Sequence, residues 1–231
     1  MRYLALASDY DGTLAHDGVV DSPTIRALER LIHSGRQLIL VTGRELADLT
    51  SVFSRIELCE RVVAENGAVL YHPATGEKHL LAACPPPSFI EDLRRRGVPG
   101  ISCGEAIIST WRPHETQVLE AIRESGLKLQ VILNKESVMV LPSGVDKKTG
   151  LRAALQELQI SHHNLAGIGD AENDHAFLES CGCSAAVANA IPALKEKVDF
   201  VTQGERGAGV VEFIDRLIAN DLSGLSEHPR S

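Results

Sequence analysis

"LALASDYDGTLAHDG", residues 4–18, begins with an apolar run that passes directly into two carboxylates. Residues 3–8 are apolar, few in number and followed by turn formers, which is typical of a strand buried in a sheet. Asp9 and Asp11 come next, separated only by Tyr10. Two like charges so close together at the edge of a buried sheet repel each other and resist desolvation. The pair therefore predicts cationic partners elsewhere in the chain.

Strand and helix signals alternate on both sides of this stretch. A helix is expected after residue 21, with Ser22 at its N-cap, Pro23 at its first position and Gly35 at its exit. Further buried strands are expected at residues 37–42, 61–65 and 164–170. Buried strands alternating with amphipathic helices predict an α/β fold, a Rossmann-like parallel sheet with helices on both faces.

The alternation breaks near residue 83, where three prolines occur in the segment CPPPSF. After it we expect a helix, a strand, a second helix and two strands joined by a polar turn (residues 88–97, 105–111, 115–126, 129–135 and 137–142). This order predicts a small antiparallel sheet that carries two helices. The expected organisation is a catalytic core of residues 1–82 and 145–231, interrupted by an inserted α+β cap of residues 83–144.

The charge and composition of the chain argue against several kinds of binding partner. The net charge of −8, without a long Lys/Arg block, argues against nucleic acid and against an anionic membrane surface. No apolar run approaches the ~18 residues that span a bilayer, and the apolar N-terminal run is too short for a signal peptide. Five scattered cysteines, an odd number, indicate reduced thiols. We expect a cytoplasmic protein, and the sequence does not indicate its oligomeric state or whether it is part of a longer chain.

Polar clusters follow three of the predicted strands. Asp9 and Asp11 follow the first strand, residues 42–44 (Thr-Gly-Arg) the second, and residues 169–174 (GDAEND) a later one. In an open parallel sheet, ligands bind outside the carboxyl ends of the strands, so these clusters are expected to meet. A pool of carboxylates needs a cation, and a few hard oxygen ligands favour Mg²⁺.

The same residue types supply a reaction on phosphorus. A carboxylate can attack phosphorus and carry the phosphoryl group as an aspartyl phosphate. A second carboxylate two residues later can protonate the leaving oxygen and then activate water. Thr42 and Lys147 would hold the phosphoryl oxygens. A calcium loop is excluded because its sixth and twelfth positions would be Leu14 and Val20. The Asp-x-Asp pair alone also occurs in metal-dependent sugar transfer and among solvated turn acids.

Four segments resemble, in order, the motifs of the haloacid dehalogenase superfamily of phosphatases. They are DYDGT (9–13), VTGR (41–44), Lys147 at the start of a helix, and GDAEND (169–174). ENGAVLY (65–71) and the insertion resemble the Cof-type branch of this superfamily, which has a class IIB cap and includes phosphoglycolate and sugar phosphatases. The resemblance extends over nearly the whole chain.

This resemblance implies roles for the acidic residues. Asp9 would be the nucleophile and Asp11 the general acid/base. Mg²⁺ would be bound by the side chains of Asp9 and Asp170 and by the backbone carbonyl of Asp11. Asn173 and Asp174 would support the metal or Lys147.

The resemblance also implies a phosphate site. Thr42 and the backbone of Gly43 would bind the phosphoryl group, and Lys147 would bridge it to Asp9. The family usually has Lys-Gly at this motif, whereas this chain has Lys147 followed by Lys148, so Lys148 remains an alternative.

Three other residues near these motifs also have expected roles. Thr13 would orient the Asp11 loop. Arg44 would contact substrate, or pair with Glu45 or another surface acid. Asn66 would line the pocket, although Asn-Gly is also a common turn. In the cap, the segment with Trp111, Arg112 and His114 forms either a substrate-contacting loop or an ordinary surface loop. The pair His162–His163 is interpreted as surface histidines.

The function implied is Mg²⁺-dependent hydrolysis of a small phosphorylated metabolite, of the sugar phosphate or phosphoglycolate class, by a phosphoric monoester hydrolase. One alternative is a phosphomutase of the phosphomannomutase type, which returns the phosphoryl group to its substrate. Another is a catalytically silent binding protein with the same fold.

Overall fold

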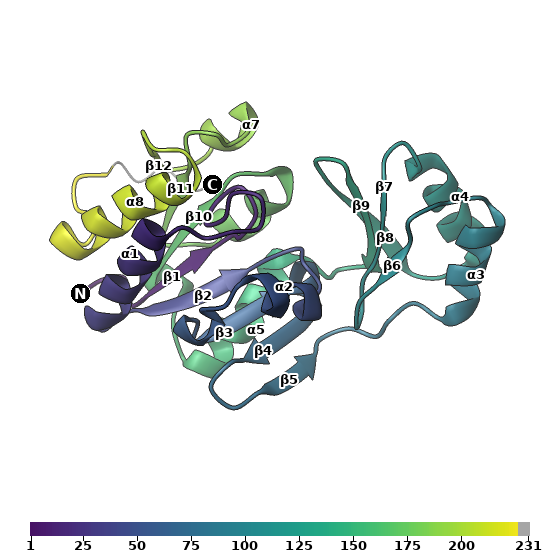
Figure 1. Cartoon of the computed structure of the whole chain (residues 1–231), viewed down its shortest axis with the longest axis horizontal. Coiled ribbons are helices and arrows are strands. Elements are labelled where there is room, and N and C mark those ends of the chain that lie inside the picture. The colour runs from purple at the N-terminus through teal and green to yellow at the C-terminus, as the bar shows by residue number, and fades with distance from the viewer. Residues whose placement is uncertain (226–231) are drawn as a thin grey trace.

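Residues 1–225 are described by a computed structural model, in which a large α/β core carries a smaller α+β cap. Two chain connections join the parts, one after β5 (Glu77–Leu80) and one after β9 (Ser137–Pro142) (Figure 1). The cap elements begin at Pro87 and end at Pro142, inside the range expected for the insertion. The exact division at residues 83 and 145 stays a prediction.

The core contains an eight-stranded sheet with the order β12-β11-β10-β1-β2-β3-β4-β5. The strands from β12 to β3 run parallel, and β4 and β5 form an antiparallel hairpin at one edge. The remaining strands are β1 (Ala5–Ser8), β2 (Gln37–Val41), β3 (Arg61–Ala64), β4 (Val69–His72), β10 (Leu165–Gly169), β11 (Cys183–Ala186) and β12 (Phe200–Val201).

Helices cover both faces of this sheet, as predicted. On one face α1 (Ser22–His33) packs against α8 (Arg206–Asn220), and on the other α5 (Lys147–Leu158) packs against β3 and β4 (Figure 1). Shorter helices complete the core, namely α2 (Leu46–Val52), α6 (His175–Leu178) and α7 (Pro192–Lys195). Because both faces are covered, the central strands are continuous apolar runs, and residues 38–41 are fully buried. Within residues 1–225, no helix combines the length and apolar character needed to cross a membrane.

The cap is a four-stranded antiparallel sheet with the order β6-β7-β9-β8. Besides β9 it consists of α3 (Pro87–Arg95), β6 (Ser102–Cys103), β7 (Ile108–Trp111), α4 (Glu115–Ser125) and β8 (Leu129–Asn134). Its helices cover one face of the sheet, where Phe89 and Leu93 pack with Val140. Met139 and Leu141 lie on the other face and pack with Ala68 of the core.

Two local predictions were wrong. Asp21, and not Ser22, is the N-cap residue of α1, because the Asp21 carboxylate accepts the backbone N–H of Thr24 at 2.8 Å. The cap strand expected from residue 105 begins at Ile108. The backbone N–H groups of residues 105–107 donate instead to the carboxylate of Glu65 in the core.

Candidate active site

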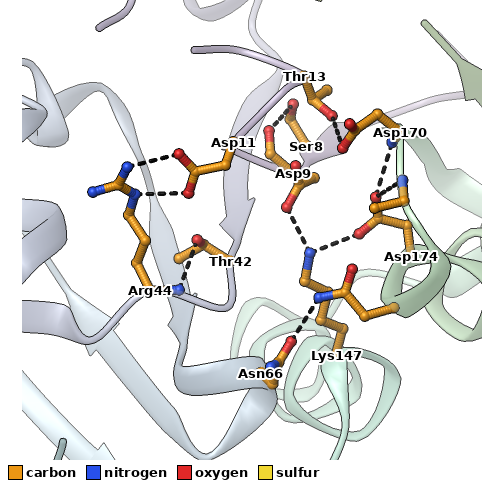
Figure 2. Close-up of polar contacts among 12 residues, drawn as sticks. Ser8, Asp9, Asp11, Thr13, Thr42, Arg44, Asn66, Lys147, Asp170 and Asp174 are labelled. Carbon is orange, nitrogen blue, oxygen red and sulfur yellow. Dashed lines mark hydrogen bonds and ion pairs between the residues drawn. The ribbon is translucent and has the colours of Figure 1, made fainter. Parts of the chain in front are cut away.

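The predicted polar clusters meet at the carboxyl ends of three neighbouring strands. β1 pairs with β10 on one side and with β2 on the other. The side chains of Asp9, Thr42 and Asp170 therefore lie along one edge of the sheet, and Lys147 reaches this edge from the first turn of α5 (Figure 2). This arrangement follows from the rule that parallel strands bring their carboxyl ends together.

Lys147 connects two of the carboxylates. Its side chain is 1% exposed, and Nζ donates to Asp9 Oδ1 at 2.5 Å and to Asp174 Oδ1 at 2.6 Å (Figure 2). Close contact between backbones sets the start of α5. Gly67 has a φ of +103°, and a Cβ there would lie 1.9 Å from the carbonyl oxygen of Asp146, the residue before Lys147. Only glycine fits this position, so Gly67 helps to place the lysine.

Lys148 points elsewhere. It is exposed and lines a surface hollow of about 460 Å³ together with Arg152, His162 and His163. The two histidines precede β10, at the opposite end of that strand from Asp170. The structure thus brings Lys147, and not Lys148, into contact with Asp9.

Asp174 holds the loop that carries Asp170. Its Oδ2 accepts the backbone N–H groups of Asp170 at 2.9 Å and of Ala171 at 3.0 Å, while its other oxygen binds Lys147. Thr13 donates to Asp170 Oδ1 at 3.3 Å, so its contact is with Asp170. Asp174 is fully buried and positions both a carboxylate and the ammonium group.

The buried carboxylates carry more negative charge than Lys147 balances. One oxygen from each of Asp9, Asp170 and Asp174 lies within 4.8 Å of the others. Burial raises the pKa of Asp9 to about 8, with Asp174 and Asp170 acting in the same direction and Lys147 against it. Burial also raises the pKa of Asp170. A divalent cation would relieve this repulsion, and carboxylate and carbonyl oxygens are the ligands that Mg²⁺ prefers.

The backbone carbonyl oxygen of Asp11 also lies near a cationic side chain. Lys135, from the turn between β8 and β9 of the cap, places Nζ 2.9 Å from Asp170 Oδ2 and 3.4 Å from Asp11 O. These are two of the oxygens that the family resemblance assigns to Mg²⁺. In this structure these oxygens are therefore already paired with a positively charged group.

The carboxylate of Asp11 faces away from Asp9. Arg44 binds it with two hydrogen bonds, Nε to Oδ2 and Nη2 to Oδ1, each of 2.7 Å (Figure 2). Arg44 also donates to Asp48 at 2.6 Å, and the hydrogen bond with Asp11 helps to raise the pKa of the guanidinium group. Of the alternatives for Arg44, the structure shows pairing with acids. Glu45 is not among them and instead accepts from Ser102 of the cap.

Thr42, Gly43 and Asn66 form a second polar group. Asn66 is buried in a left-handed conformation with a φ of 51°. Its Oδ1 accepts from Asn173 at 2.9 Å, and its amide nitrogen lies 2.8 Å from Met139 Sδ of the cap. Asn173 therefore contacts Asn66, whereas it was expected to support the metal or Lys147. Thr42 is also buried, and its hydroxyl accepts the backbone N–H of Arg44 at 3.1 Å.

Sequence reasoning missed Glu65 and Lys135. Glu65 is fully buried and ties the core to the cap through three backbone hydrogen bonds of 2.8–3.0 Å. An acid at the end of a predicted strand carries no pattern that distinguishes it from a solvated one. Lys135 occurs in a polar turn, where lysine is common. Trp111, from the expected cap cluster, is 58% exposed at the end of β7.

Comparisons with known proteins agree with this geometry. A family model described as haloacid dehalogenase-like hydrolase matches residues 6–93 and 104–214. A phosphoglycolate phosphatase from Methanopyrus kandleri is 30% identical over 91% of this chain and 95% of its own length. One from Methanothermobacter thermautotrophicus is 29% identical over 93% and 98%.

Solved structures share the fold. A Thermoplasma acidophilum protein superposes with a TM-score of 0.80 at 20% identity, covering 93% of this chain and 97% of its own. A sugar phosphatase of haloacid dehalogenase subclass IIB gives 0.76 at 20% identity, covering 92% and 98%. The expected α/β fold and the resemblance to the Cof-type phosphatases are confirmed. The chain belongs to the haloacid dehalogenase-like hydrolases.

Proposed function

We propose that this protein is a Mg²⁺-dependent phosphatase that hydrolyses a small phosphorylated metabolite through an aspartyl-phosphate intermediate on Asp9. The observation that carries the proposal is the buried contact of Lys147 with Asp9 and Asp174. A carboxylate held by a fixed ammonium, beside a cluster of further carboxylates, is suited to a reaction in which a dianionic phosphoryl group and a divalent cation arrive together. The family, and the phosphatases among its relatives, support this reaction class.

The roles follow from the contacts. Asp9 attacks phosphorus, and the bond to the leaving oxygen breaks as that oxygen takes a proton. Lys147 keeps the Asp9 carboxylate in place and neutralises part of the phosphoryl charge. Asp9, Asp170 and the carbonyl of Asp11 would hold Mg²⁺, which would supply further charge neutralisation. Thr42 and Gly43, which follow β2, would receive the phosphoryl oxygens.

Asp11 has to turn before it can act as the acid. In this structure its carboxylate is held by Arg44, on the side away from Lys147. We assign this ion pair to the substrate-free state, in which Arg44 holds the Asp11 carboxylate away from Asp9. Rotation of the Asp11 side chain towards the leaving oxygen would break its ion pair with Arg44. The Asp11 carboxyl group would then contact the substrate. Asp11 would then donate the proton and afterwards take one from the water that hydrolyses the intermediate.

The substrate class rests on the relatives. Two phosphoglycolate phosphatases align along nearly the whole chain, and a sugar phosphatase shares the fold. Both classes are compact phosphate esters. A cytoplasmic location remains a prediction, supported by five free cysteines.

The test is phosphate release from a panel of phosphorylated metabolites, with Mg²⁺ and with EDTA. We expect release only with Mg²⁺, and its loss by at least about 10³-fold in Asp9→Asn, because the amide is not a nucleophile. Asp17→Asn is the matched control, since Asp17 lies in the same loop with its side chain 92% exposed. Near-normal rates in Asp9→Asn, or isomerisation of a hexose phosphate without phosphate release, would overturn the proposal.

A further inference from the structure

Lys135 brings a cationic group from the cap to the candidate active site. It lies in the turn that joins β8 and β9, with a left-handed backbone (φ 53°), and this hairpin points towards the core (Figure 1). Its Nζ approaches Asp170 and the carbonyl of Asp11. Gly12 leaves space where the two groups meet, because a Cβ there would lie 2.4 Å from Asp170 Oδ2 and 2.9 Å from Nζ. The core thus leaves room for this particular ammonium group.

The other cations at the site are already engaged. Lys147 is held between two buried carboxylates, and Arg44 is held between Asp11 and Asp48. Lys135 differs, since its side chain is 52% exposed and one ion pair, with Asp170, is recorded for it among residues 1–225. Lys135 is the cation that the cap contributes to this site, and its exposed side chain leaves it free to change partner.

The cap side chains that pack against the core beside Asn66 are apolar. Met139 is the cap residue that contacts Asn66, and the side chains packed around it are apolar, including Ile107 and Leu141. A substrate bound between Asp9 and the cap would lie near the positive charge of Lys135. An anionic group on the part of the substrate that carries the leaving oxygen would strengthen binding there. A neutral group would add little to the binding free energy.

Occupation of the cation position would release Lys135 from its present partner. A divalent cation between Asp9, Asp170 and the Asp11 carbonyl would repel an ammonium group at the same oxygens. The flexible stem of lysine allows Nζ to move while the hairpin stays in place. Nζ would then be free to pair with an anionic group of the substrate.

We propose that Lys135 determines specificity by binding a carboxylate of the substrate, so that the preferred substrate is the phosphate ester of a short hydroxy acid. This inference rests on the proposed phosphatase function and deepens it, because it chooses between the two substrate classes left open above. The phosphate ester of a neutral sugar has no carboxylate for Lys135 to bind.

The test compares phosphoglycolate with 2-hydroxyethyl phosphate, which has the same length and a neutral end. We expect the wild-type kcat/KM to favour phosphoglycolate, and Lys135→Met to reduce this preference by about 10- to 100-fold, the usual effect of losing a hydrogen bond between charged groups. The change should lie mainly in KM. Lys128→Met is the matched control and should keep the wild-type preference, because Lys128 is exposed at the opposite end of β8.

A binding measurement separates this inference from the proposed function. In the Asp9→Asn background with Mg²⁺, calorimetry should show that Lys135→Met weakens binding of phosphoglycolate far more than binding of the neutral ester. If both esters are hydrolysed and the preference is unchanged in Lys135→Met, the inference is overturned and the phosphatase stands. If neither ester releases phosphate but Lys135-dependent carboxylate binding is measured, the inference stands and the phosphatase proposal falls.

Discussion

Replacing Lys147 by methionine tests the buried centre of the site, with Lys148→Met as its control. The two lysines are adjacent, yet Lys147 is 1% exposed between two carboxylates and Lys148 is exposed to solvent. Methionine retains most of the apolar volume of lysine, so the substitution removes the charge and leaves packing near Phe177 largely intact.

The expected loss follows from the burial of both partners. Removing one member of a buried ion pair costs about 3–5 kcal/mol, because the other member stays buried without its counter-charge. In Lys147→Met both Asp9 and Asp174 lose their ammonium partner, so the upper part of this range is expected. Lys148→Met should change stability by no more than about 0.5 kcal/mol.

Urea unfolding of the metal-free protein in EDTA at pH 7 measures this difference. The loss in Lys147→Met should shrink at pH 5. Lys147 lowers the pKa of Asp9, so without the lysine this pKa rises further in the folded state, and protonation of Asp9 at lower pH favours folding. Equal and small losses in both variants would refute the assignment of Lys147.

Two further predictions concern the acids of the site. First, burial raises the pKa of Asp9 from 3.8 to about 8. The folded metal-free protein therefore holds an extra proton over this interval, and its stability falls as the pH rises through it. Cation binding displaces that proton, so calorimetry between pH 6 and 8 should show Mg²⁺ affinity rising by up to about tenfold per pH unit. Second, Glu65→Gln weakens the three hydrogen bonds to residues 105–107 and should cost about 1–3 kcal/mol. Hydrogen exchange should report faster exchange of those amides.

Both predictions have controls in the chain. Asp9→Asn removes one titrating group and should reduce the pH dependence of Mg²⁺ affinity, whereas a flat profile in the wild type would contradict the first prediction. Glu120→Gln lies on the exposed face of α4 and should leave exchange at residues 105–107 unchanged. Slow exchange there in Glu65→Gln would contradict the second.

The parallel core sheet and the edge that carries the site could be predicted from the sequence. Apolar runs followed by polar residues mark strands whose carboxyl ends meet, and this rule brings Asp9, Thr42 and Asp170 together without knowledge of the tertiary structure. The side-chain directions did not follow from it. That Asp11 turns to Arg44 depends on a guanidinium group from a neighbouring loop, which no local pattern encodes.

Contacts between the cap and the core could not be predicted from the sequence either. Glu65 binds amides about forty residues later, and Lys135 reaches Asp170 from a turn of the cap. Both contacts depend on how the inserted sheet lies against the core. The N-cap of α1 was misassigned for a local reason, because Asp21 and Ser22 are both good N-cap residues.

The central claim is that Asp9 carries the phosphoryl group. The most direct measurement is borohydride trapping during turnover of a phosphate ester, followed by peptide mass spectrometry, since borohydride reduces an acyl phosphate to an alcohol. We predict homoserine at position 9, only when both Mg²⁺ and the ester are present. Rapid turnover with Asp9 unmodified, or reduction at Asp11 or Asp170 instead, would contradict it.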